Sequence, residues 1–213
     1  MANSKYSYYF TVVIYEEFTR LHKLLELGSI YQSPIHYSCQ MENLGTSSIM
    51  AFPNINELCL GKSIGHKKPH RHLLLKTANS YTENTFVEKL VKLLDNDLTG
   101  ISIHLGDVLV KKPELMIRYF YHLDNPIKEH FNLENAFQDV MPAFSKEVAK
   151  AFEVEITQLI KNKIYNGEFC GIQDILLYYD NSFVLNEFLR VSHNLYLVNS
   201  IIKDYRFLIQ QTF

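Results

Sequence analysis

The segment Pro69-His-Arg-His-Leu-Leu-Leu-Lys-Thr77 decides how the first part of the chain is interpreted. Its run of leucines between turn-like neighbours predicts a β-strand over about 69–77. Side chains two residues apart on a strand point to the same face, about 6.6 Å apart along it, so His70 and His72 can converge on one metal ion. The chain holds nine histidines in 213 residues, however, and a His-x-His pair alone is also typical of an ordinary strand face.

Strand and helix patterns interleave on both sides of this segment. Aromatic and β-branched residues predict a buried strand over Ser7–Tyr15, and the apolar spacing of Glu16–Leu27 predicts an amphipathic helix with Gly28 as its C-cap. A second strand is expected at about 30–37. Beyond the histidine strand, the patterns predict a helix to Leu94 capped by Thr82 or Asn84, strands at 101–105 and 108–111, and a helix over 114–122.

Strand character disappears after about residue 130. The apolar periodicity predicts one long helix over Ser145–Tyr165, shorter helices at 172–179 and 184–191, and a last helix from about Leu195 to Ile209. The simplest fold class is therefore α+β, with an all-helical second domain that begins near Pro142. Its apolar surface exceeds what a small bundle hides, which favours either self-association or packing onto the first domain.

Composition describes a globular chain, with 47% hydrophobic and 21% charged residues. No apolar run approaches the roughly 18 residues that span a bilayer, and no apolar signal region follows a basic start, so a soluble, cytoplasmic protein is expected. Cys39, Cys59 and Cys170 are widely spaced and predict neither a disulfide framework nor a zinc knuckle.

Net charge gives little reason to expect a nucleic acid partner, because it is −2 with an isoelectric point near 6.5. Basic residues nevertheless gather around the histidine pair, at Lys62, Lys67, Lys68, Arg71 and Lys76. They would place a positive field beside a metal ion, although a solvated lysine-rich loop has the same pattern.

Two further residues extend the histidine pair into a possible catalytic site. His36 follows Ser33-Pro-Ile at the end of the second predicted strand, and a neighbouring strand would bring three imidazoles to one ion with open positions, as catalytic metal sites require. Such an ion can polarise a phosphodiester. Tyr119 lies on the helix before Asp124-Asn-Pro126 and is the candidate nucleophile. Because tyrosine has a pKa near 10, the metal or a basic neighbour such as Arg118 or Lys128 would have to lower it.

Three motifs in this order resemble one family of proteins. Ser33–His36, Lys67–Leu75 and Met116–Pro126 are similar to the replication initiators (Rep) of small rolling-circle plasmids from Gram-positive bacteria. The similarity is greatest to the streptococcal and lactobacillal type, in which a tyrosine endonuclease domain carries a helical oligomerisation domain. It extends over essentially the whole chain, since the opening strand Tyr8–Tyr15 and the helical tail also fit.

The resemblance implies a fold and a set of site residues. The expected fold is an α+β chain with an antiparallel-sheet His-hydrophobe-His (HUH) endonuclease domain flanked by helices at 1–142, followed by an all-α oligomerisation domain at 143–213. His70 and His72 match the paired metal ligands, His36 the upstream ligand, and Tyr119 the nucleophile, with Tyr121 as its rival. The residues expected to bind DNA are Lys67, Lys68, Arg71, Arg118 and Lys128.

The resemblance also implies an activity and its partners. With Mn²⁺ or Mg²⁺, a member of this family nicks a hairpin at the plasmid's double-strand origin through a covalent phosphotyrosine and later rejoins the strand. It binds nearby repeats, passes the DNA to a host helicase and polymerase, and forms a homo-oligomer, for which a hexamer is one option.

One departure from the family pattern concerns the metal. An acidic ligand is expected just after the upstream histidine, where this chain has Cys39. Thiolate would shift the preference towards zinc or similar softer ions, while Glu42 or water could take the place instead. The segment 38–66 is also longer than in compact relatives and either shapes origin recognition, shields the site or is neutral. His66, His104 and His122 are interpreted as non-ligands.

Other interpretations are weaker but distinct. A cupin metal site would need a glutamate shortly after the histidine pair, where this chain has Leu73-Leu-Leu-Lys76. A single-tyrosine transposase or a mobilisation relaxase shares the chemistry but differs in its domain organisation. An origin-binding or assembly protein that kept the fold and lost nicking would explain Cys39.

Overall fold

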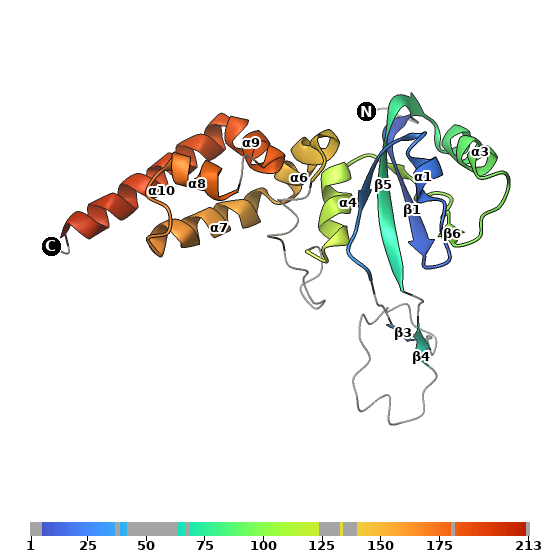
Figure 1. The fold of residues 1–213 in the computed structure, drawn as a ribbon, viewed down its shortest axis with the longest axis horizontal. Coiled ribbons are helices and arrows are strands. Elements are labelled where there is room, and N and C mark those ends of the chain that lie inside the picture. Colours follow the sequence, from blue (N-terminus) through green and yellow to red (C-terminus); the bar gives the residue numbers. More distant parts are fainter. Residues whose placement is uncertain are drawn as a thin grey trace. The chain divides into compact units, whose positions relative to one another are not determined.

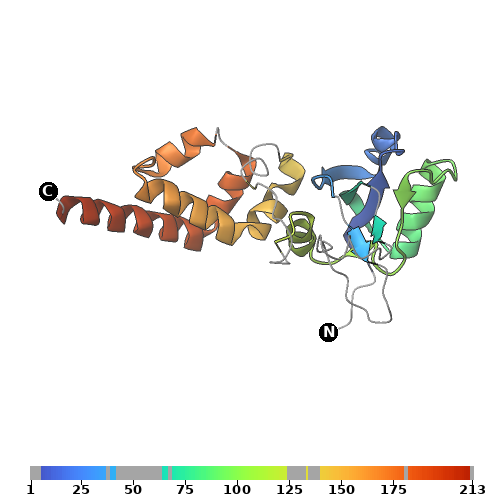
Figure 2. The same cartoon turned by 90° about the horizontal axis from the view of Figure 1, so that it is seen from below.

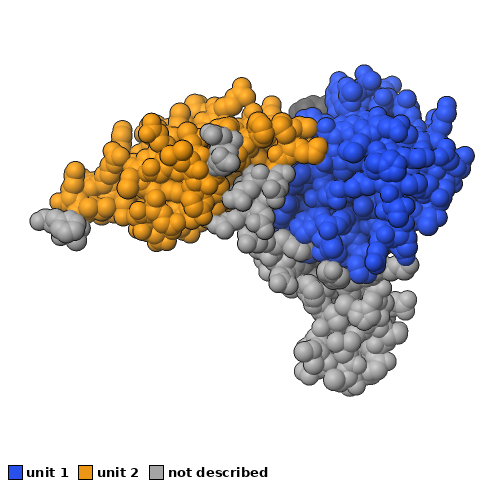
Figure 3. Space-filling model, in the orientation of Figure 1, with its two compact units in different colours: residues 1–131 blue, residues 132–213 orange. Residues whose placement is uncertain are grey.

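A computed structural model of the protein describes residues 6–36, 69–123, 133, 140–179 and 182–211, together with the backbone of 39–41 and 64–66. The chain divides into two compact units, Met1–Phe131 and Asn132–Phe213 (Figure 3). The predicted domains, 1–142 and 143–213, place the division later in the chain. Within the described residues, no helix has the length and apolar character that crossing a membrane would require.

Unit 1 is built on a small antiparallel sheet (Figure 1). Its strand order is β2-β5-β1-β6, and β7 also pairs with β1. The strands are β1 (Ser7–Tyr15), β2 (Gly28–Gln32), β5 (His70–Tyr81), β6 (Ile101–Ser102) and β7 (Leu109–Val110). Two short strands, β3 (Cys39–Met41) and β4 (Ile64–His66), pair separately. The predicted mixed α+β class with an antiparallel sheet is confirmed at this level.

The histidine strand is an interior strand of the sheet, because β5 pairs with β2 on one side and β1 on the other. Successive residues of β5 point to opposite faces of the sheet, so its odd-numbered and its even-numbered residues lie on different faces. Leu73 and Leu75 point into a core with Phe10 of β1 and with Phe86 and Leu90 of α3 (Glu83–Leu93). The Phe10 and Phe86 rings stack with centroids 4.0 Å apart. His70 and His72, which alternate with these residues, consequently belong to the other face of the strand.

That other face carries α4 (Pro113–Phe120), so that α3 and α4 lie on opposite sides of the sheet (Figure 2). The Phe120 ring stacks with Tyr31 of β2, with centroids 6.3 Å apart. The apolar side chains Ile117 and Phe120 are fully buried. Packing of one apolar helix face against the sheet therefore holds α4 beside the histidines.

The expected helix over Glu16–Leu27 is the clearest error of the sequence interpretation in unit 1. Only α1 (Leu21–Leu24) is helical, and Gly28 begins β2 rather than capping a helix. A Cβ at Gly28 would lie 2.1 Å from the carbonyl oxygen of Lys76. The glycine is required by this close approach to β5, a tertiary contact that helical periodicity cannot reveal. The α3 prediction is confirmed, and Thr82 is its N-cap.

Unit 2 carries the 3₁₀ turn η1 (Pro142–Phe144) and the helices α6 (Ser145–Ala151), α7 (Glu153–Tyr165), α8 (Ile172–Tyr178), α9 (Phe183–Arg190) and α10 (Ser192–Gln211). The predicted helix over 145–165 is interrupted at Phe152, whose backbone leaves helical geometry at φ −112° and ψ 21°. The Phe152 side chain is fully buried. Packing of α6 against α9 and of α7 against α10 forms this unit's interior.

Candidate metal centre

Three buried histidines of unit 1 converge on one point. His36, His70 and His72 can each offer one ring nitrogen such that the three nitrogens lie within 4.8 Å of one another. Nitrogens bound to one ion at about 2.0–2.1 Å stand at most about 4.2 Å apart. The cluster is therefore close to the spacing that a shared ion needs, and it could hold a divalent metal.

The backbone holds His36 against the histidine strand. β2 ends at Gln32, and His36 then forms an isolated antiparallel bridge with His70. The His36 N–H donates to the His70 carbonyl at 2.8 Å, and the His70 N–H donates to the His36 carbonyl at 3.2 Å. The condition set by the sequence, that the strand before His36 neighbours the histidine strand, is thus met.

Ser33 secures the same turn from its other end. Its N–H donates to the His72 carbonyl at 2.9 Å, and its hydroxyl accepts from the His72 N–H at 2.9 Å. Ser33 is almost fully buried. Residues 33–36 are therefore hydrogen-bonded to β5 at both His70 and His72. The bonds from Ser33 explain why a serine precedes the proline there.

The tyrosine helix orients the His36 ring. His36 Nε2 lies 2.9 Å from the carbonyl oxygen of Phe120, the last residue of α4. A carbonyl can only accept, so Nε2–H donates, and in the neutral ring Nδ1 keeps the lone pair. Backbone carbonyls commonly fix metal-binding histidines in this way. The contact joins a candidate ligand directly to the residue after Tyr119.

His122 also reaches the cluster, although the sequence interpretation set it aside as a non-ligand. Its Nε2 lies 3.3 Å from His36 Nδ1, and the two ring centroids are 4.6 Å apart. A left-handed backbone at His122, with φ 60°, turns the chain as α4 ends. The sequence signal for this contact is the position of His122 three residues after Tyr119, because residues with this spacing lie on the same side of a helix. His122 thus lies beside the His36 nitrogen that keeps the lone pair in this tautomer.

Tyr119 faces the histidines. Its half-buried ring meets the His72 ring edge-on with centroids 5.1 Å apart, and the His36 centroid lies 6.4 Å away. The predicted nucleophile therefore has its ring against the histidine cluster.

Tyr121, the predicted rival, has a different environment. Its hydroxyl pairs with the Tyr31 hydroxyl at 3.0 Å in a buried position. Burial raises the pKa of Tyr121, and burial together with the Tyr121 contact raises the pKa of Tyr31 well above its usual value. Both phenols are therefore held in the protonated form, which is a poor nucleophile.

The remaining predicted site residues divide into two groups. Arg118 lies on α4 directly before Tyr119, and the Arg71 guanidinium donates from Nη1 to the Ser33 carbonyl at 3.0 Å. The backbone of Cys39 pairs with that of His66. The side chain of Cys39, and the residues Glu42, Lys67, Lys68 and Lys128, lie outside the described residues, and their expected roles stay predictions.

Compared with models of protein families and with curated protein sequences, the chain matches none of them. Three imidazoles leave at least one position open on even a four-coordinate ion, as in catalytic rather than structural sites. The ring of Tyr119 packs against that of His72, on a helix whose last carbonyl orients His36.

Proposed function

We propose that the protein is a metal-dependent, site-specific single-strand DNA endonuclease and strand transferase of the His-hydrophobe-His type, and that it initiates rolling-circle replication of a plasmid. One observation carries the proposal. The ring of Tyr119 packs against a cluster of three buried histidines, and the hydrogen bond from His36 to the Phe120 carbonyl ties the two together. The order of the three sequence motifs supports the assignment to the plasmid Rep proteins.

His36, His70 and His72 would hold the metal ion. When bound, the ion polarises the scissile phosphodiester and offsets the charge that builds up on its oxygens. Imidazole is a poor ligand for Mg²⁺, which prefers oxygen, so a site of these three histidines suits Mn²⁺ or a softer ion better. An additional oxygen ligand, from Glu42, would make the site more suitable for Mg²⁺.

Tyr119 carries out the transfer. Its phenolic oxygen forms a bond to the phosphorus while the bond from phosphorus to the 3′-oxygen breaks. The phenol proton passes to solvent, and the departing 3′-oxygen takes up a proton to become a free 3′-hydroxyl. The DNA remains attached through a 5′-phosphotyrosine, and attack by a 3′-hydroxyl on the same phosphorus releases the tyrosine and rejoins the strand. Arg118 is the proposed cationic neighbour of the phenol.

The rest of the chain fits the same role. The sheet with α3 and α4 on its two faces would be the endonuclease domain, and the helices of unit 2 an oligomerisation domain. Large apolar side chains are exposed on those helices, and such surfaces mark sites of association. They include Val154, Leu177, Phe183, Tyr196, Phe207 and Leu208. The proposed partners are origin DNA, further copies of the chain, and a host helicase and polymerase in the bacterial cytoplasm.

Nicking of DNA by matched tyrosine variants tests the proposal. A supercoiled plasmid carrying the DNA that flanks the coding sequence serves as substrate, with Mn²⁺ or with a chelator. Nicked circles should form only with the ion, disappear in Tyr119→Phe and persist in Tyr121→Phe. Cleavage that survives Tyr119→Phe would overturn the assignment. So would DNA binding without cleavage under any divalent ion, which would favour an origin-binding protein that has lost nicking.

A further inference from the structure

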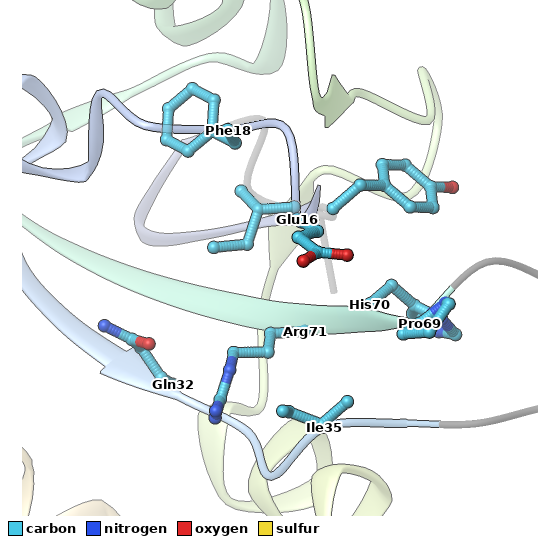
Figure 4. A pocket seen from close by; sticks show the side chains of 9 residues that line it. Glu16, Phe18, Gln32, Ile35, Pro69, His70 and Arg71 are labelled. Carbon is cyan, nitrogen blue, oxygen red and sulfur yellow. The ribbon is translucent and has the colours of Figure 1, made fainter.

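A second feature lies at the same end of the sheet as the histidines. A cavity of about 410 Å³ opens where β1 and β2 end and β5 begins (Figure 4). This volume falls within the range of about 300 to 1,000 Å³ that is common for small-molecule sites. His70 is one of its lining residues, so the cavity and the candidate metal centre have this residue in common.

The residue between the two paired histidines lines this cavity. The proposed class has a hydrophobic residue there, whereas this chain has Arg71. On β5, Arg71 alternates with His70 and His72 and shares the side of Leu73, but it lies at the strand's end, beyond the closed core. Its side chain is only partly buried. The chain therefore has a cation at a position where the proposed class has an apolar side chain.

Arg71 is held in place and still has donors to offer. Nη1 donates to the Ser33 carbonyl at 3.0 Å, which fixes one arm of the guanidinium. Guanidinium has five N–H donors in a planar fork, so several remain for a ligand in the cavity. The turn that positions His36 therefore also positions Arg71.

Two other polar side chains line the cavity, between apolar walls that include Ile14 and Ile35. Glu16 follows β1 and Gln32 ends β2, and both are exposed (Figure 4). Within the described part of the chain, the Glu16 carboxylate takes part in neither a hydrogen bond nor an ion pair. The cavity thus combines apolar walls with a fixed cation, an amide and an available carboxylate.

We propose that this cavity binds one unpaired nucleobase of the strand that is cut, beside the scissile phosphate, and that guanine fits it best. The inference rests on the proposed function. Single-stranded bases are recognised by apolar contact with their faces and by hydrogen bonds to their edges. Arginine pairs with O6 and N7 of guanine, and a carboxylate can accept from N1–H and the N2 amino group. Guanine carries these acceptors and these donors on one base, which suits a cavity lined by Arg71 and Glu16.

Binding of short oligonucleotides tests the inference without any cleavage. Fluorescence anisotropy is measured in chelator on labelled thymidine nonamers whose central residue is deoxyguanosine, deoxyinosine, deoxyadenosine, deoxycytidine or thymidine. The wild type should bind the deoxyguanosine nonamer about tenfold more tightly than all-thymidine. Deoxyinosine, which lacks the N2 amino group, should lose part of this preference.

Variants separate base recognition from general charge. Arg71→Lys keeps the positive charge and loses the planar fork, so it should erase the guanine preference while all-thymidine binding stays within about twofold. Glu16→Gln should reduce the preference for deoxyguanosine over deoxyinosine. Lys89→Met, at an exposed position on α3, is the control and should leave the preference intact.

Failure here is distinguishable from failure of the proposed function. Equal affinity for all nonamers, or a preference that survives Arg71→Lys, overturns the base site even if Tyr119 still nicks DNA. Absence of binding to every nonamer overturns the base site as well and also counts against an enzyme that acts on single strands.

Discussion

Divalent metal should stabilise the fold of unit 1, and His72→Gln should abolish the effect. An ion that binds only the folded state at a hundred times its Kd adds about 2.7 kcal/mol to the free energy of unfolding. Unit 1 runs from Met1 to Phe131. At about 2.1 cal/mol/K per residue, its entropy of unfolding is about 0.28 kcal/mol/K, so the expected rise in Tm is about 10 °C.

His72 is the sharpest position for this substitution. Its ring contacts those of His36, His70 and Tyr119, so it lies at the middle of the candidate centre. Glutamine retains a neutral polar side chain and removes the imidazole. His104→Gln is the matched control, because the exposed His104 ring lies 3.3 Å from the Ser102 hydroxyl, outside the cluster.

Differential scanning calorimetry is the suitable assay, since the chain has no tryptophan to report unfolding. The protein is freed of metal with a chelator and titrated with Mn²⁺, Mg²⁺, Co²⁺ or Zn²⁺. The wild type and His104→Gln should show the rise, and His72→Gln should not. A transition that no ion moves, or one that moves equally in His72→Gln, would refute the metal centre.

Three further predictions concern the fold around the site. Gly28→Ala places a Cβ 2.1 Å from the Lys76 carbonyl oxygen and should lower the free energy of unfolding by about 1–3 kcal/mol in urea titrations; an unchanged midpoint would count against the close β2–β5 approach. Thr82→Ala removes the N-cap of α3 and should cost about 1 kcal/mol by the same assay, whereas a neutral effect would exclude the cap. Because the pKa values of Tyr31 and Tyr121 are raised on folding, the stability they confer is complete below their unfolded pKa near 10 and is lost above it. Thermal melts from pH 8 to 11 should show less alkaline loss in the double variant Tyr31→Phe/Tyr121→Phe, and an equal loss would contradict the buried pair.

The sequence predicted those parts of the site that depend on local pattern. Alternation on the histidine strand placed His70 and His72 on one face, and the structure confirms the strand as β5. The proline that begins α4 and the glutamate in its first turn predicted the helix that carries Tyr119. These features depend on near neighbours in the chain, which is why pattern alone sufficed.

The missed features depend on contacts between distant segments. Periodicity over Glu16–Leu27 was helical, but the approach of Gly28 to β5 shortened the helix to α1. The contact of His122 with His36 depends on the turn after α4, which no local pattern predicts. Arg71 was among the residues expected to bind DNA, but the cavity that it lines is formed by the ends of three strands, which no local pattern reveals.

Locating the covalent DNA linkage tests the central claim most directly. A single-stranded origin oligonucleotide is incubated with the protein and Mn²⁺, the complex is denatured and digested with nuclease and protease, and the peptides are sequenced by tandem mass spectrometry. The account predicts a nucleotide joined through its 5′-phosphate to Tyr119. An adduct on Tyr121 or on any other residue, or cleavage that leaves no adduct, would contradict it.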